Sequence, residues 1–256
     1  TGTGQIINGA GLFEKDGLRL STKEGTNPLL LFNSDCKGKT GSRACTGGDD
    51  DLATGASYGT QNQGNVLIIQ ENISKNKNQT NNIYNPDDKV KGTFVFDFTD
   101  SEGVLFESIS LLDLDESHRP KFTLKYVDGT RRLFQYKNNK WKTKSFGDSS
   151  QNDFKSWRRL TNDHDGNSDF AVTLDNKEVN GKLYKGDNSL RTYNFNKFNA
   201  QVAKMEMWLP GSGAVTGLEY KRAKRKVPEP LGAIGLGLAT SVILAKKRRR
   251  KSNSQV

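Results

Sequence analysis

Cysteine and histidine, which often supply nucleophiles, bases and metal ligands, are scarce in this sequence. Its 256 residues include two of each. A zinc site built on Cys36 and Cys45 would need further ligands, and the only histidines are His118 and His164. There is also no Gly-x-Ser-x-Gly, no His-Glu-x-x-His and no phosphate-binding loop. No catalytic motif therefore selects an enzyme class, and we predict a protein without catalytic activity.

Hydrophobic residues are also few, at 33% of the chain, and the mean hydropathy is −0.75. This balance excludes a membrane protein with many spans. A wholly disordered chain is not expected either, because 13 Phe, 7 Tyr and 3 Trp can supply a core. The length suits one domain with a tail.

The charge is strongly basic, with 39 Lys and Arg against 29 Asp and Glu and a pI of about 9.5. Such a pI invites a nucleic-acid interpretation. However, residues 221–256 contain eleven basic side chains and one acidic side chain, which accounts for the whole net charge of +10. Residues 1–220 contain 28 of each sign. The excess lies in the tail, so we predict no nucleic-acid partner for the body.

The tail has three parts in a fixed order. Pro228-Glu229-Pro230 comes first, then an uncharged run from Leu231 to Ala245, and then a basic cluster from Lys246 to Lys251. As a helix the run would reach about 22 Å, which is short of a ~30 Å hydrocarbon core, but the flanking basic side chains can extend its span. We expect a single transmembrane helix with a cytoplasmic C-terminal end. The alternative is a buried core helix, although such a helix should show a polar face and this run has none.

This order resembles the PEP-CTERM sorting signal of Gram-negative bacterial surface proteins. The resemblance implies export, transient membrane anchoring and processing by an exosortase. Its sorting residues would be Pro228, Glu229, Pro230, Arg248, Arg249 and Arg250. Two features depart from the pattern: a trailing Ser252–Val256 and a second basic patch at Lys221–Lys226, which leaves the cleavage position open.

The chain accordingly divides into four predicted parts. Residues 1–220 form an ectodomain and residues 221–227 a basic linker. Residues 228–251 form the sorting and anchor segment, and residues 252–256 a short tail.

Eight residues separate the two cysteines, Cys36 and Cys45, and the intervening loop is rich in Gly, Ser, Thr and Lys. In an exported protein such a pair predicts a disulfide, which would stabilise the fold by roughly 2–3 kcal/mol. A metal or redox site is the alternative.

The ectodomain is predicted to be all-β. Short apolar or alternating runs recur between turn-rich segments, and Asp128-Gly129 is typical of a hairpin turn. Only Asn152–Leu160 suggests a helix. Many short strands at this spacing favour a jelly-roll-like β-sandwich. The expected strands are Leu29–Phe32, Asn65–Gln70, Thr93–Phe98, Ser108–Leu114, Lys121–Val127, Arg131–Tyr136, Phe170–Leu174, Val202–Leu209 and Val215–Tyr220.

The order of several short blocks over residues 28–220 is similar to that of exported bacterial β-sandwich domains that often carry PEP-CTERM tails. The resemblance implies a fold and a compartment but no established reaction. Departures are the segment between Cys36 and Cys45 and the pair Thr216-Gly217. The blocks include Gly47–Leu52, Gly64–Glu71, Asn85–Asp88, Gly92–Phe98, Ser108–Glu116 and Gly211–Val215.

Acidic side chains gather in several short clusters. Hard cations bind six to eight oxygens, and loops rich in Asp and Asn supply them. We therefore predict a structural Ca²⁺ as the one candidate cofactor. The alternative is that these carboxylates are solvated turn residues. The candidate ligands are Asp49, Asp51, Asp87, Asp88, Asp113 and Asp115.

The stretch from Lys121 to Arg159 mixes Lys and Arg with aromatic residues. Tyr136 and Trp141 are the candidate ligand-binding rings, since sugars stack on exposed aromatic faces. Alternatively, the rings alternate into the core while Lys and Arg line the wet face. Given export, an acidic polysaccharide is the preferred ligand.

These observations predict an exported, cell-surface or matrix-associated protein. We expect a non-catalytic module that binds carbohydrate or exopolysaccharide, with an exosortase and the membrane as transient partners. The competing hypothesis is a glycan-active hydrolase or lyase on the same scaffold, although no sequence feature selects its two carboxylates.

Overall fold

The computed structural model describes residues 6–7, 13–23, 27–35, 50–71, 77–78, 83–84, 91–114, 119–147, 157–160, 170–199 and 201–222. The chain divides into two compact units, Thr1–Lys224 and Arg225–Val256. All described residues belong to the first. Within them no helix has the length and apolar character needed to span a membrane. The expected membrane helix over Leu231–Ala245 lies outside the described residues.

The all-β class is confirmed, because the described residues form strands and three 3₁₀ turns but no α-helix. The turns are η1 (Glu14–Asp16), η2 (Asp50–Leu52) and η3 (Ala56–Tyr58). The strands are β1 (Ile6–Ile7), β2 (Leu18–Thr22), β3 (Leu29–Asn33), β4 (Asn65–Ile69), β5 (Lys77–Asn78), β6 (Ile83–Tyr84), β7 (Gly92–Phe98), β8 (Val104–Leu112), β9 (Lys121–Tyr126), β10 (Arg131–Lys137), β11 (Lys140–Phe146), β12 (Arg158–Arg159), β13 (Ala171–Leu174), β14 (Leu190–Asn194), β15 (Val202–Leu209) and β16 (Ala214–Arg222).

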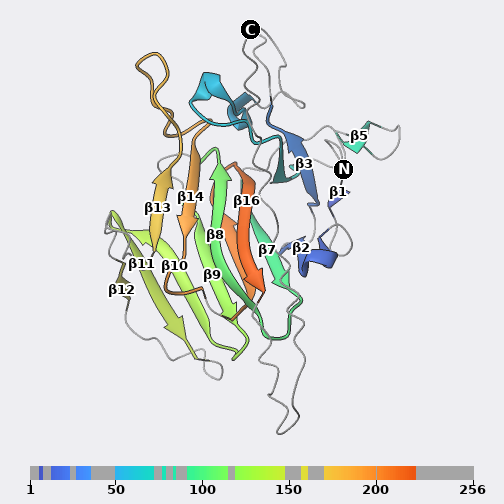
Figure 1. Ribbon diagram of the computed structural model, residues 1–256, viewed down its shortest axis with the longest axis vertical. Coiled ribbons are helices and arrows are strands. Elements are labelled where there is room, and N and C mark those ends of the chain that lie inside the picture. Colours follow the sequence, from blue (N-terminus) through green and yellow to red (C-terminus); the bar gives the residue numbers. More distant parts are fainter. Residues whose placement is uncertain are drawn as a thin grey trace, which may run out of the picture. The chain divides into compact units, whose positions relative to one another are not determined.

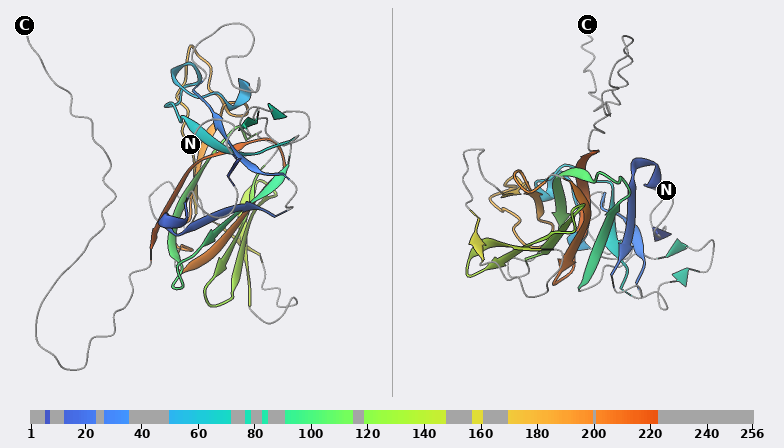
Figure 2. Two further views of the ribbon diagram at one scale, coloured as in Figure 1. Left: turned by 90° about the vertical axis from the view of Figure 1, so that its right-hand side faces the viewer. Right: turned by 90° about the horizontal axis from the view of Figure 1, so that it is seen from below.

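Hydrogen-bond pairing arranges most of these strands in two groups (Figures 1 and 2). The first layer has the order β1-β3-β4-β16-β8-β14-β13, and the second has the order β2-β7-β15-β9-β10-β11-β12. Every pairing is antiparallel. The two groups join through one pair, Val202 with Val104. Strands β5 and β6 pair only with each other.

The main core lies between the two layers, where period-2 alternation turns aromatic side chains inward. Phe122 of β9 lies 5.0 Å from the ring of Tyr193 in β14 and 5.3 Å from that of Phe195, measured between centroids. All three residues are fully buried. A smaller apolar cluster covers the other side of the first layer, where Leu52 and Ala53 pack with β3 and β4.

Most expected strands are present within one or two residues at each end. Asp128-Gly129 does connect β9 and β10, and Asn138-Asn139 turns the chain into β11 with φ angles of 54° and 57°. Both asparagines adopt the left-handed conformation that this tight hairpin turn requires. The predicted strand ending at Leu114 stops earlier, at Leu112.

The short helix expected over Asn152–Leu160 is wrong in its described part. Arg158 and Arg159 form strand β12, which pairs with Thr143 and Lys142 of β11. Leu160 is buried, and its amide donates to the Trp141 carbonyl at 3.0 Å. Residues 158–159 therefore pair with the open edge of β11, because backbone pairing to an existing strand outweighs a weak local helix preference.

Candidate functional site

A row of side chains crosses the outward surface of the second layer. Cross-strand pairing places Arg159, Lys142, Gln135, Lys121 and Trp208 in register on five neighbouring strands. Directly paired residues lie on the same face of a sheet. Their immediate chain neighbours, such as Phe122 and Trp141, are buried on the opposite face. The outward face of β9 to β12 therefore carries cations in adjacent strands.

Seven cations define this surface, which we call the basic face. None of the strands β9 to β12 contains an aspartate or glutamate. Within the described part of the chain, Lys137, Lys140, Lys142 and Arg159 make no ion pair. The basic face comprises Lys121, Arg131, Lys137, Lys140, Lys142, Lys144 and Arg159.

Aromatic rings lie beneath several of these cations. The Lys121 ammonium is 4.2 Å from the centroid of the Trp208 ring. The Lys144 ammonium is 5.5 Å from the Phe146 ring and 5.8 Å from the exposed Trp157 ring. Such contacts are worth about 0.5–1 kcal/mol at exposed sites. They position the ammonium groups without neutralising their charge.

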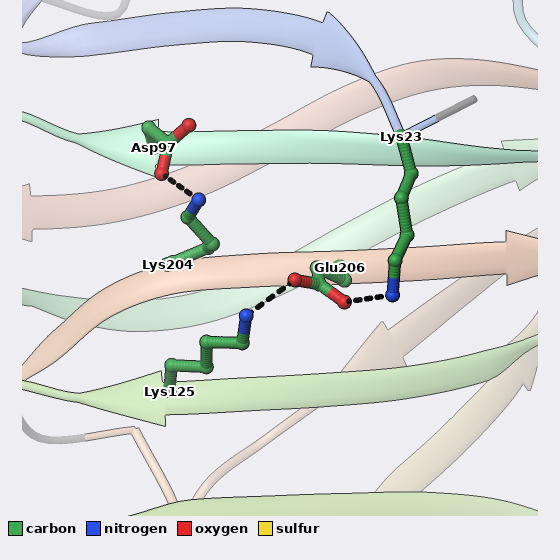
Figure 3. A network of polar contacts seen from close by, with 5 residues as sticks. All are labelled: Lys23, Asp97, Lys125, Lys204 and Glu206. Carbon is green, nitrogen blue, oxygen red and sulfur yellow. Dashed lines mark hydrogen bonds and ion pairs between the residues drawn. The ribbon is translucent and has the colours of Figure 1, made fainter. Parts of the chain in front are cut away.

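The other half of the same outward surface, on β2, β7 and β15, is charge-balanced (Figure 3). Glu206 lies between Lys125 at 2.5 Å and Lys23 at 3.2 Å, and Lys204 pairs with Asp97 at 2.7 Å. Burial acts to raise the pKa of Glu206, but hydrogen bonds from the two lysines outweigh it and lower that pKa. This half therefore presents little net charge, and the excess is confined to the basic face.

The two predicted ligand-binding rings point away from the basic face. Trp141 is only 5% exposed, and its ring packs 4.9 Å from Phe170 and 5.8 Å from Tyr193. Tyr136 is partly buried against the same core. This arrangement matches the alternative interpretation, in which the rings enter the core while Lys and Arg line the wet face. Trp141 is too deeply buried to stack on an external sugar.

Trp208 is the aromatic residue of the outward face that sequence reasoning missed. In β15 the buried residues Val202, Met205, Met207 and Leu209 face the core, while Trp208 alternates outward. That alternation is visible in the sequence and could have placed Trp208 on the wet face.

Two of the predicted calcium ligands are in the described region, and both contact one turn. The Asn188 amide donates to the Asp51 carbonyl at 2.9 Å, and the Asp113 amide donates to the Ser189 carbonyl at 2.9 Å. The Asp113 carboxylate accepts a hydrogen bond from the Ser212 hydroxyl at 2.9 Å. No group of three acidic, histidine or cysteine residues suited to a metal occurs among the described residues.

Asp113 follows the end of β8 with φ of 58°, so it does not alternate within an apolar strand as its sequence context suggests. The left-handed conformation of Asp113 turns the chain out of the sheet close to Gly213. Ser212, the neighbour of Gly213, donates a hydrogen bond to the Asp113 carboxylate. The buried Asp113 carboxylate is thus satisfied by the Ser212 hydroxyl just after the end of β8.

The remaining predicted site residues lie outside the described residues. They are the calcium candidates Asp49, Asp87, Asp88 and Asp115, the cysteines Cys36 and Cys45, and the sorting residues Pro228, Glu229, Pro230, Arg248, Arg249 and Arg250.

Comparison of this chain with protein-family models, with curated proteins and with solved structures finds no match.

Proposed function

We propose that this protein is an exported, non-catalytic module that binds acidic polysaccharide through its basic face. The observation that carries the proposal is the segregation of charge on one surface. Lys137, Lys140, Lys142 and Arg159 lie on neighbouring strands with no carboxylate on those strands, while the adjoining surface is neutralised by its own ion pairs.

The geometry suits a polymer with a repeated negative charge. Adjacent strands are about 4.8 Å apart, so the basic face offers cations at short intervals across four strands. A flexible polyanion can contact several of them at once, and each additional contact is an intramolecular event with a high effective concentration. Trp208, beneath the Lys121 ammonium, adds an apolar surface for a sugar ring.

The tail supports the location of this activity. The Pro228-Glu229-Pro230 box, the apolar run and the basic cluster favour a PEP-CTERM signal, with an exosortase as processing partner and a transient transmembrane helix. The body would then work at the cell surface or in the extracellular matrix. The paired layers further support a jelly-roll-like β-sandwich.

A structural Ca²⁺ and a Cys36–Cys45 disulfide remain parts of the proposal. A specific bound cation stabilises the folded state by mass action. Excess EDTA should therefore lower the unfolding midpoint of the protein, and re-addition of Ca²⁺ should restore it. An unchanged midpoint would remove calcium from the proposal.

The basic face is tested by neutralising its central row. We expect the triple variant Lys121→Gln, Lys142→Gln, Arg159→Gln to bind a soluble polyuronate about 10- to 100-fold more weakly, since each surface contact is worth up to about 1 kcal/mol. Affinity is measured by calorimetry at fixed salt. The matched control is Lys15→Gln, Lys177→Gln, Lys185→Gln, which removes the same charge from exposed residues elsewhere.

The control variant separates the basic face from the rest of the body, because its three lysines lie within residues 1–220 but outside that face. Equal weakening in both triple variants would mean that overall charge drives binding, and the basic face would lose its role. Binding of a neutral glucan with the same affinity would also contradict the proposal. Degradation of the polyuronate during the titration would favour the hydrolase or lyase hypothesis instead.

A further inference from the structure

The inward side of the same strands carries a second group of polar side chains, at the end of the core where β9 begins and β10 ends. Arg119 lies two residues before β9, Tyr136 is near the end of β10, and Tyr193 enters from β14 in the facing layer. Arg191 lies two residues before Tyr193 and on the same side of β14. Each layer thus contributes one guanidinium and one phenol here, Arg191 and Tyr193 from the first layer and Arg119 and Tyr136 from the second.

The hydroxyl of Tyr193 is one of the unsatisfied buried polar groups in this region. Tyr193 is fully buried, and its hydroxyl has no hydrogen-bond acceptor among the described residues. Burial raises its pKa to about 12, although the charges of Arg191 and Arg119 and hydrogen bonding from their guanidinium groups act to lower it. At neutral pH the group is therefore a protonated donor, and a buried donor without an acceptor is costly.

Arg119 is a cation with spare hydrogen-bonding capacity. Its guanidinium lies 5.3 Å from the centre of the Tyr136 ring, and its Nε is buried without a hydrogen-bond acceptor among the described residues. In the part of the chain that the structure describes, Arg119 forms no ion pair. An unneutralised guanidinium beside buried rings favours an anion, because a low dielectric strengthens the attraction.

Arg191 adds a second positive charge and helps to fix the geometry. It is 5% exposed. Its Nη1 donates to the Leu114 carbonyl at 2.8 Å, and its Nη2 donates to the Lys185 carbonyl. These bonds hold the guanidinium in place at the end of the core beside Tyr193.

We propose that Arg119 and Tyr193 form a binding site for the carboxylate group of a small organic acid. The Nε edge of a guanidinium presents two parallel donors, which match the two oxygens of a carboxylate. The Tyr193 hydroxyl supplies a third donor. A carboxylate is favoured over phosphate or sulfate, because a monoanion costs less to transfer into a site with buried donors than a dianion.

This site is separate from the basic face. Phe122 and Trp141, which pack against Tyr193, are inward neighbours of Lys121 and Lys142, so the sheet itself lies between the two surfaces. The inference therefore does not depend on polysaccharide binding.

The test is a thermal-unfolding titration of the full chain with sodium acetate and with sodium glucuronate. Sodium chloride at equal ionic strength, glucose and sodium phosphate are the comparison solutes. The variant Tyr193→Phe removes only the hydroxyl and keeps the ring in the core. Its matched control is Tyr126→Phe, because the Tyr126 hydroxyl already donates to the Phe198 carbonyl at 3.0 Å at the other end of β9.

We expect both carboxylates to raise the unfolding midpoint in a saturable way, and glucose and chloride to have no such effect. Tyr193→Phe should fold and should bind the carboxylates about tenfold more weakly or worse, while Tyr126→Phe should bind as the original chain does. Absence of a saturable shift would overturn the proposal. So would equal affinity in Tyr193→Phe, or phosphate binding as tight as carboxylate binding.

Discussion

Replacing Trp141 with alanine separates the two roles that the sequence allows for this ring. In the structure Trp141 contacts four aromatic rings, with centroid distances of 4.9 Å to Phe170, 5.7 Å to Tyr136, 5.8 Å to Tyr193 and 6.1 Å to Phe122. A ligand-stacking ring would not be so enclosed. The substitution should therefore act on stability.

The expected loss can be estimated from this environment. Truncation of a buried Trp or Phe to alanine costs about 3–5 kcal/mol, because the transferred surface and the residual cavity both contribute. Trp141 is 5% exposed and should reach the upper part of that range. For a domain of this size, each kcal/mol lowers the unfolding midpoint by about 2–4 °C. A fall of about 10–20 °C is therefore expected for Trp141→Ala.

Trp208→Ala is the informative comparison, because Trp208 lies on the outward face beneath Lys121. Its removal should lower stability by about 1 kcal/mol, the size of an exposed cation–π contact. Denaturant unfolding measures stability for both variants, and polyuronate calorimetry measures binding. We expect Trp141→Ala to lose stability while its folded fraction keeps its affinity, and Trp208→Ala to lose affinity.

The reverse pattern would refute this assignment. If Trp141→Ala unfolds at the same denaturant concentration as the original chain but no longer binds polyuronate, the ring is a ligand platform. The placement of β11 would then be wrong by one residue, because a one-residue slip of register exchanges the two faces of a strand.

Three further predictions concern individual contacts. The pKa of Glu206 is lowered by its lysine partners, so its stabilising effect is present above about pH 4.5 and is lost as the pH falls further. Glu206→Gln should therefore cost about 1 kcal/mol at pH 7 and much less at pH 3 in paired urea melts, and an equal cost at both pH values would contradict this. Gly59 has φ of 72°, and a Cβ there would lie 1.9 Å from the Lys177 carbonyl oxygen, whereas Gly64 with φ of 66° has open space. Gly59→Ala should destabilise the protein by about 1–3 kcal/mol more than Gly64→Ala, and equal midpoints would show that the loop yields freely. Burial raises the pKa of Tyr193 to about 12, so the neutral phenol stabilises the fold fully below pH 10 and this contribution is lost as the pH rises through 12. Tyr193→Phe should resist alkaline unfolding by about 2–3 kcal/mol relative to the original chain at pH 12, and a parallel loss in both proteins would argue against it.

Much of the fold could be predicted from periodicity and turn chemistry. The alternation of Phe94, Phe96 and Phe98 identified β7, and Asp128-Gly129 identified the hairpin between β9 and β10. These signals are local, since they depend on residues within a few positions of each other. Pairing between distant strands, such as β8 with β16, leaves no such local mark.

The site was harder to predict because facing directions depend on register. Trp141 and Lys142 are neighbours, and only the pairing of Trp141 with Tyr136 decides which of them enters the core. The Lys and Arg residues between Lys121 and Arg159 were visible in the sequence, but their gathering on one outward face was not. The burial of Asp113 could not be predicted, because its partner Ser212 is 99 residues away in the chain.

The position of β16 in the first layer has a consequence for the order in which the protein can fold. It is the last described strand in the chain, yet it lies between β4 and β8 and joins the two halves of its layer. The first layer therefore cannot close until residues 214–222 are available, and such long-range pairing is slow. Until β16 pairs, the edges of β4 and β8 that it covers stay exposed. Completion of the first layer thus waits for the last described strand, which extends to Arg222.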